Sequence, residues 1–267
     1  MRIRSVDVTP FHSFPYFNAA SGGGTETRQC SLFRAKADAL PPEIQALVIA
    51  SDLQGVVGSA PSSQLLGVGL ADELAALSAT GRVPPLNAVG AVLAGDLFSA
   101  PRADKRGASG DVRDVWLAFA SRFRFVVGVA GNHDTFGTPE ELAALKATPG
   151  VHLLDGDVAN LDGVVIGGVG GISGDPAKPQ RRHEREFLRA LRRVVDADAK
   201  VVVLHHGPDA DRGRLRGSPE IRQALDRSGP RLVICGHVYW PEPLVDIRGG
   251  AQVLNADSRV VVVTRGD

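Results

Sequence analysis

Five short apolar segments recur along the chain, and each ends abruptly at a glycine or a polar residue. They consist mostly of Val, Ile, Leu and Ala, with almost no polar position inside them. Continuous runs of this length are typical of parallel strands that are buried on both faces of a sheet. The predicted strands span residues 47–50, 88–94, 125–130, 200–204 and 231–235.

Segments with helical periodicity lie between and after these strands. Leucines recur at helical spacing over residues 65–80, and Thr138-Pro139 is a typical helix start, with threonine as N-cap and proline at the first helical position. Strands followed by helices, without repeats or linkers, predict a single α/β domain over residues 1–267, with two packed sheets flanked by helices. Further helices are predicted over 112–121 and 180–195, and short strands over 151–154, 164–169, 251–258 and 260–264.

The first 40 residues form a separate pattern. Residues 2–8 alternate between apolar and polar positions, which predicts a half-buried strand, and residues 30–37 are predicted to return as its hairpin partner. The aromatic segment 11–17 between them is predicted to be a loop that covers a corner of the core; a lid, a dimer contact and a substrate platform are the alternatives. The glycine run 22–24 marks a turn at a loop tip.

Residues that ligate metals in proteins follow all five predicted strands. In open α/β sheets, ligands bind at the carboxyl ends of the strands, so we expect one site assembled from these five ends. After the third predicted strand, an amide, an imidazole and a carboxylate stand in consecutive positions. They offer a metal ligand, a proton carrier and a group that can orient that carrier. The polar residues are Asp52; Asp96; Asn132, His133 and Asp134; His205 and His206; and His237.

The order of these blocks along the chain carries a family resemblance. Asp52, Gly95-Asp96, Gly131-Asn132-His133-Asp134, the histidine pair and Gly236-His237 together resemble the calcineurin-like metallophosphoesterase superfamily, over residues from about 47 to 263. The resemblance implies a four-layer αββα sandwich of two mixed sheets flanked by helices. It also implies that two divalent metal ions support hydrolysis of a phosphate ester.

The resemblance assigns a role to each matching residue. Asp96 would bridge the two ions, and Asn132, a histidine of the pair and His237 would complete one half-site. We prefer His206, which stands two residues before Pro208 as in the family's usual pattern, with His205 as the alternative. The imidazole of His133 would stand beside the substrate as leaving-group acid or transition-state stabiliser, with its ring held by Asp134.

The other half-site departs from the family pattern. Asp52 is present, but Gln54 and Tyr239 stand where the resemblance leads us to expect histidines. An amide oxygen suits Mn²⁺ or Mg²⁺ better than Zn²⁺, so Mn²⁺ is the preferred ion, with iron and zinc as alternatives. Three interpretations follow: two ions with altered preference at Asp52; one tight ion and a second that binds only with substrate; or a catalytically weakened scaffold.

Composition adds few constraints. Lys and Arg total 30, as do Asp and Glu, so net charge gives no reason to expect a polyanionic partner. No apolar run reaches the length of a membrane span, and the first residues lack the apolar core of a signal peptide. Two cysteines do not make a disulfide framework. Together these features predict a cytoplasmic protein.

The predicted function is that of a metal-dependent phosphoesterase acting on a phosphomonoester or phosphodiester through a metal-activated water. The alternatives are a nuclease acting on DNA or RNA and the weakened scaffold. Arginines in three strand-end loops, residues 97–113, 173–182 and 209–216, favour an anionic substrate such as a phosphorylated small molecule or nucleotide. Six arginines on the helix at 180–195 leave nucleic acid as an alternative partner, although a solvated helix face explains them more simply. No oligomeric state is predicted.

Overall fold

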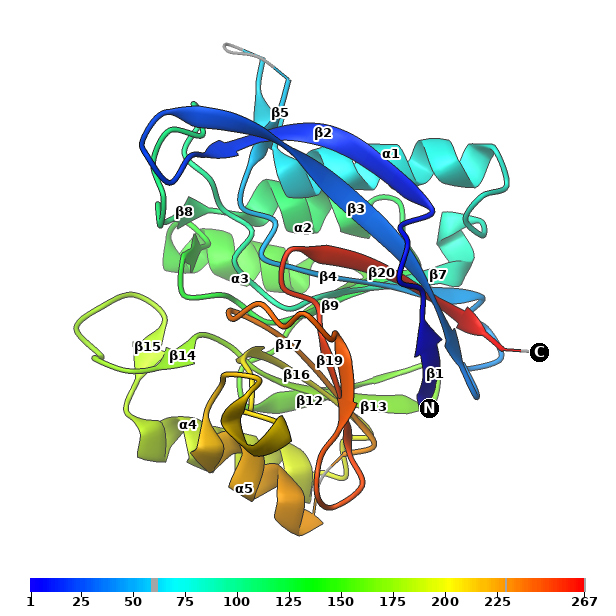
Figure 1. Ribbon diagram of the computed structural model, residues 1–267, viewed down its shortest axis with the longest axis vertical. Helices are drawn as coiled ribbons and strands as arrows, with labels where there is room; N and C mark the ends of the chain where they lie inside the picture. Colours follow the sequence, from blue (N-terminus) through cyan, green and yellow to red (C-terminus); the bar gives the residue numbers. More distant parts are fainter. Residues whose placement is uncertain (59–61, 229, 267) are drawn as a thin grey trace.

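Two mixed sheets pack face to face and are covered by helices on their outer faces (Figure 1). The computed structural model describes residues 1–58, 62–228 and 230–266. Five α-helices lie in this described part: α1 (Leu66–Ala79), α2 (Arg113–Ala120), α3 (Pro139–Ala147), α4 (Glu184–Asp196) and α5 (Pro219–Ser228). None of them combines the length and the apolar character needed to cross a membrane.

The larger sheet has ten strands and the smaller has six. From edge to edge, the larger sheet contains β11 (Val151–Leu153), β9 (Phe125–Gly128), β7 (Val89–Leu93), β4 (Ala46–Ser51), β20 (Arg259–Arg265), β3 (Thr25–Ala37), β2 (His12–Ala19), β5 (Val56–Val57) and β6 (Gln64–Leu65), with β1 (Ile3–Val6) paired to β3. The smaller contains β12 (Asp157–Leu161), β13 (Val164–Val169), β16 (Val201–His206), β17 (Leu232–Gly236), β19 (Gln252–Asn255) and β18 (Leu244–Asp246). Two-stranded pairs join β8 (Gly110–Asp111) to β10 (Asp134–Thr135) and β14 (Ile172–Ser173) to β15 (Arg181–Arg182).

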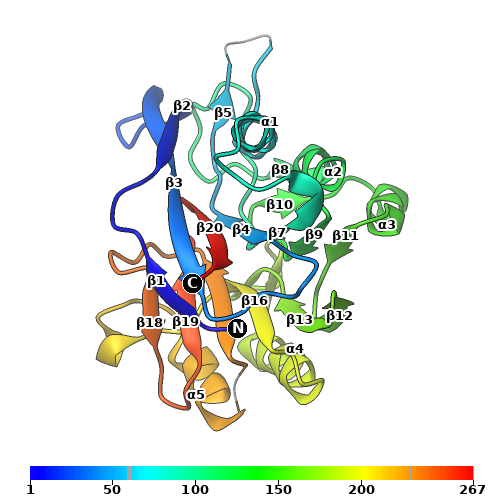
Figure 2. The same cartoon turned by 90° about the vertical axis from the view of Figure 1, so that its right-hand side faces the viewer.

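Figure 2 shows the helices and the two sheets as successive layers. Three apolar cores lie between these layers. Successive residues of one strand enter different cores: Val48 of β4 faces α1 and α2, whereas Ile49 faces the second sheet. On β16, Val203 enters the central core and Val202 packs toward α4 and α5. Because both faces of these strands are buried, their sequences are continuously apolar. The predicted αββα sandwich is therefore confirmed.

Several local predictions need correction. The aromatic segment predicted as a loop is mostly strand β2, which pairs with β3 from His12↔Leu32 to Ala19↔Thr25. Helix α4 begins at Glu184 rather than near residue 180, because Arg181 and Arg182 pair with β14. Helix α5 was not predicted at all. In contrast, α3 begins as expected, with Thr138 as N-cap and proline at the first position.

Close packing of β9 against β7 gives a stability prediction. A Cβ atom added at Gly128 would lie 1.9 Å from the carbonyl oxygen of Leu93, so Gly128→Ala must displace the strand. We expect a loss of about 1–3 kcal/mol in the free energy of unfolding, as for other overpacked core positions, measured by urea denaturation. Gly22→Ala is the control, because a Cβ there meets nothing within 4 Å. Equal urea midpoints for the two variants would contradict the prediction.

Candidate metal centre

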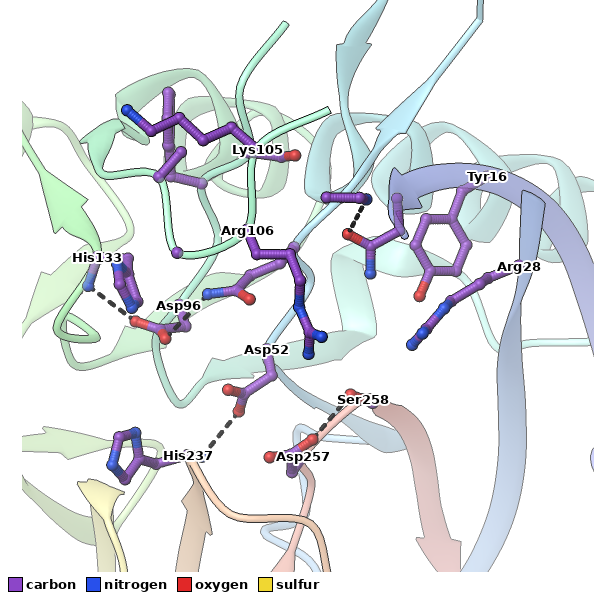
Figure 3. Close-up of a pocket in the computed structure, with 17 residues that line it drawn as sticks. Tyr16, Arg28, Asp52, Asp96, Lys105, Arg106, His133, His237, Asp257 and Ser258 are labelled. Carbon is purple, nitrogen blue, oxygen red and sulfur yellow. Dashed lines mark hydrogen bonds between the residues drawn. The ribbon is translucent and has the colours of Figure 1, made fainter. Parts of the chain in front are cut away.

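Side chains predicted from five strand ends meet at one place, and Figure 3 shows Asp52, Asp96, His133 and His237 among them. Asp52, Asp96 and Asn132 follow β4, β7 and β9 of the larger sheet. From the smaller sheet, β16 ends at the histidine pair and β17 is followed by His237. The ligand atoms of Asp96, His205 and His237 all lie within 4.8 Å of one another.

The His205 ring shows what this cluster can hold. Its Nδ1 lies 2.8 Å from the carbonyl oxygen of Ala94, which accepts the ring proton and so fixes the tautomer. The other nitrogen, Nε2, lies 3.3 Å from Asn132 Oδ1 and 3.4 Å from Asp96 Oδ1. A lone pair therefore faces two oxygen acceptors, and this arrangement requires a proton or a cation between them. One imidazole, one amide oxygen and one carboxylate fit a divalent ion.

Electrostatics in the cluster show that a proton can occupy this position at neutral pH, so a divalent ion that binds there would have to displace it. Burial alone would lower the pKa of His205, but the charge of Asp96 and the hydrogen bond to it raise that pKa to about 10. Burial would raise the pKa of Asp96, yet His205 lowers it to about 2. Burial and the neighbouring His205 and His206 lower the pKa of His237 to about 4, which leaves its ring neutral at pH 7 and able to ligate.

The two adjacent histidines face different surroundings. His205 is fully buried inside the cluster. His206, which we preferred from the sequence, accepts hydrogen bonds at Nδ1 from the backbone N–H of Ser173 at 3.3 Å and is 3.1 Å from the Ser173 hydroxyl. His205 Nε2 therefore lies between Asp96 and Asn132, whereas the His206 ring contacts Ser173 and Phe187 and also lies 5.5 Å from the His237 ring.

The surroundings of Asp52, where the sequence predicts a second half-site, contain one of the two unusual residues. Asp52 Oδ2 accepts from the Ser51 hydroxyl at 2.7 Å and from the backbone N–H of His237 at 2.9 Å. Gln54 Nε2 donates to Asp96 Oδ2 at 3.1 Å, so this amide lies beside the predicted bridging carboxylate. Tyr239 is 57% exposed, and its ring stacks 4.4 Å from the Arg259 guanidinium. The structure thus brings Gln54 to the site and leaves Tyr239 outside it.

Asp257 is a site residue that we did not predict. It follows β19, forms a bridge with Ser51 and lines the same cavity as Asp52 and Asp96. Burial raises the pKa of Asp257, and burial together with Asp257 and Asp96 raises the pKa of Asp52 to about 8, against the opposing charge of His205. The signal in the sequence is weak, because β19 begins and ends with an amide and Asp257 follows two residues after its end.

Backbone conformation is unusual at these strand ends. Asp52, Asp96 and His237 have φ values of +54°, +55° and +70°, in the left-handed region that side chains other than glycine rarely adopt. Such strain is concentrated at functional sites. Gly131 leaves room for Asp96, since a Cβ atom at residue 131 would lie 2.0 Å from the Asp96 nitrogen.

The orientation of His133 differs from the expected one. Both oxygens of Asp134 are occupied, because Oδ2 accepts from the N–H groups of Asp96 and Gly131 and Oδ1 accepts from Leu97. The His133 ring instead has its Nδ1 3.1 Å from the Ser109 hydroxyl. Asp134 therefore fixes the loop that carries the site, and Ser109 is the residue that contacts the His133 ring.

A cavity of about 330 Å³ opens beside the cluster. Asp52, Gln54, Asp96, His133, His237 and Asp257 line one side of it. Among the side chains that the structure describes in the three arginine-containing loops, those of the loop at residues 97–113 contribute to its lining. Elsewhere, Arg182 pairs with Asp155 at 2.8 Å and Arg214 pairs with Asp211. The remaining lining comes from the β2–β3 hairpin and from Ser258.

Comparison with known families agrees with this geometry. The model of the calcineurin-like phosphoesterases matches residues 46–241, most of the chain. This chain belongs to that family. Membership supports metal-dependent hydrolysis of phosphate esters as the general chemistry of the chain. The matched region begins after the β2–β3 hairpin and ends before Asp257. None of the curated proteins matches the chain.

Solved structures resemble the fold. The crystal structure of TT1561 from Thermus thermophilus has a TM-score of 0.56 and 17% identity, covering 80% of this chain and 90% of that one. A looser likeness, with a TM-score of 0.43 and 14% identity, relates the chain to phosphopantetheinyl hydrolase (PptH) from Mycobacterium tuberculosis, covering 79% and 88%. At 17% identity, the likeness to TT1561 concerns the fold alone.

Proposed function

We propose that this chain hydrolyses a phosphomonoester or phosphodiester at the cluster of Asp96, Asn132, His205 and His237. The observation that carries the proposal is the convergence of their ligand atoms beside a cavity that His133 also lines. Divalent ions bound there would neutralise charge on the phosphoryl oxygens and lower the pKa of an attacking water.

The chain's own residues organise the reaction. Asp96 Oδ1 accepts the backbone N–H of His133 at 2.9 Å, so the carboxylate and the His133 ring are held by the same turn. From the cavity wall, the His133 imidazole can donate a proton to the leaving oxygen or a hydrogen bond to the phosphoryl group. Ser109 keeps the His133 ring in place through its contact at Nδ1.

Oxygen donors dominate the Asp52 half-site. The carboxylates of Asp52 and Asp257 and the amide of Gln54 line the cavity there. We propose that this half-site prefers Mn²⁺ or Mg²⁺, which bind oxygen ligands, over Zn²⁺. A second candidate function, a scaffold with weak or no catalysis, is favoured by one observation: Tyr239 is turned out of the half-site and supplies no ligand.

Hydrolysis of bis(p-nitrophenyl) phosphate with Mn²⁺, Mg²⁺ or Zn²⁺ tests the proposal. Chelator-treated protein is expected to be inactive, and Mn²⁺ is expected to restore the highest rate. Metal content after reconstitution should be measured on the same samples, because one tight ion and two tight ions then give different stoichiometries. Absence of turnover with every divalent ion, in protein that binds metal, would favour the scaffold.

A further inference from the structure

The β2–β3 hairpin forms a wall of the cavity although it lies outside the family match. The match begins at residue 46, whereas Tyr16, Asn18 and Arg28 of the hairpin line the cavity. Tyr16 and Arg28 are direct cross-strand partners, and Asn18 lies two residues after Tyr16, so all three share one face of the hairpin. The hairpin therefore adds polar side chains to a site whose metal ligands come from other strands.

Contacts hold this wall in place. At the hairpin tip, the Thr25 hydroxyl donates to the carbonyl oxygens of Arg102 and Ala103 at 3.0 and 3.3 Å, which ties the hairpin to the loop that carries Arg106. Arg28 forms an ion pair with Glu26, with 2.6 Å between Nε and Oε1, and a substrate anion would share this guanidinium with the Glu26 carboxylate. The hairpin and the loop thus form one continuous side of the cavity.

Arg106 supplies a second guanidinium from that loop. Figure 3 shows this guanidinium pointing into the cavity, above Asp52 and Ser258, with the Tyr16 hydroxyl and Arg28 beyond it and His133 on the far side. Within the described part of the chain, Arg106 forms no ion pair with a carboxylate. A guanidinium in this position can bind an anionic oxygen in a forked geometry.

We propose that Arg28 and Arg106, with the Tyr16 hydroxyl, bind a second anionic group of the substrate, separate from the phosphoryl group at the metal centre. This inference rests on the proposed function for its substrate. A cavity of about 330 Å³ lies in the range of about 300–1,000 Å³ for small-molecule sites, so it accommodates more than one phosphate. Its lining is mostly polar, which favours a charged extension over an apolar one. The substrate class is a phosphate ester that carries another phosphate or carboxylate.

Two chromogenic esters test this directly: thymidine 5′-(p-nitrophenyl phosphate) and the same ester with a 3′-phosphate. Their scissile bonds and leaving groups are identical, so a ratio of kcat/KM reports only the second anion. We expect a preference of at least about tenfold for the 3′-phosphorylated ester, since one charge-assisted hydrogen bond changes binding by roughly that factor. The double variant Arg28→Gln/Arg106→Gln should reduce the ratio to near one.

Matched controls come from the same two segments. Arg102→Gln alters the same loop, where Arg102 pairs with Asp104 at 3.0 Å, and Arg34→Gln alters the same strand, where Arg34 stacks 4.3 Å from the Phe11 ring. Neither residue lines the cavity. Both variants should keep the wild-type ratio. A wild-type ratio near one, or an equal fall in the controls, would overturn the proposal.

Failure of hydrolysis would not leave the anion site untested. Binding of thymidine 3′,5′-bisphosphate and of thymidine 5′-monophosphate should then be compared by calorimetry. Tighter binding of the bisphosphate that is lost in the double variant would support the anion site and count against only the hydrolytic function. Equal binding of the two ligands by the wild type would reject the anion site, whatever the activity.

Discussion

Asp96→Asn is expected to reduce kcat/KM for phosphate ester hydrolysis by about 10³-fold or more. The carboxylate accepts from Gln54 and from the backbone N–H of His133 and lies 3.4 Å from His205, so its charge is central to the cluster. An asparagine there keeps the shape but loses that charge. Metal ions contribute several kcal/mol to phosphoryl transfer, and about 1.4 kcal/mol corresponds to tenfold in rate. Steady-state kinetics measures the loss of kcat/KM, and analysis of bound metal measures the loss of metal from the same variant.

A well-matched control is Asp162→Asn. Asp162 also has a left-handed backbone, with φ of +49° against +55° for Asp96, and asparagine tolerates that conformation. It also contacts a basic side chain, with 2.7 Å between its Oδ2 and Arg124 Nε. Asp162 does not line the cavity, so this variant should retain both metal and rate. Wild-type metal content and a rate within tenfold for Asp96→Asn would contradict the prediction.

Local sequence was sufficient to locate the strands that build the site. Strands such as β4 and β9 are buried on both faces, so their apolar runs and abrupt polar ends are visible without knowledge of the fold. Because the carboxyl ends of these strands meet, the convergence of Asp52, Asp96 and Asn132 followed from their positions alone. Asp257 also follows a strand, but β19 has amides at both ends, so no continuous apolar run marks this position.

Side-chain direction was harder to predict than position. Tyr239 follows His237, whose φ of +70° turns the chain in a direction that no residue pattern specifies, and its ring stacks on Arg259 instead of facing the cluster. Likewise, Asp134 is adjacent to His133 in sequence, yet its oxygens are occupied by backbone N–H groups. These outcomes depend on loop geometry and on competition between donors, which arise only in the folded chain.

The choice between His205 and His206 has the same physical origin. Successive residues of a strand point to opposite faces, so only one of the two can face the larger sheet. His205 reaches the Ala94 carbonyl there, whereas the His206 ring lies 6.1 Å from that of Phe187 in α4 and 5.5 Å from that of His237. The spacing between His206 and Pro208 does not show whether the side chain of His205 or that of His206 faces the larger sheet.

His205→Ala and His206→Ala are therefore expected to differ strongly. Removing His205 takes away the ring nitrogen that faces Asp96 and Asn132, so metal affinity and kcat/KM should each fall by about 10²-fold or more, since even indirect contacts to metal ligands are worth about 10–100-fold. His206→Ala should lower both by less, because the Nδ1 atom of His206 accepts from the Ser173 N–H and its ring borders His237 without lying between Asp96 and Asn132. Metal affinity is measured by competition with a chromophoric chelator, and circular dichroism checks folding. The reverse order of losses in folded variants would assign the ligand to His206.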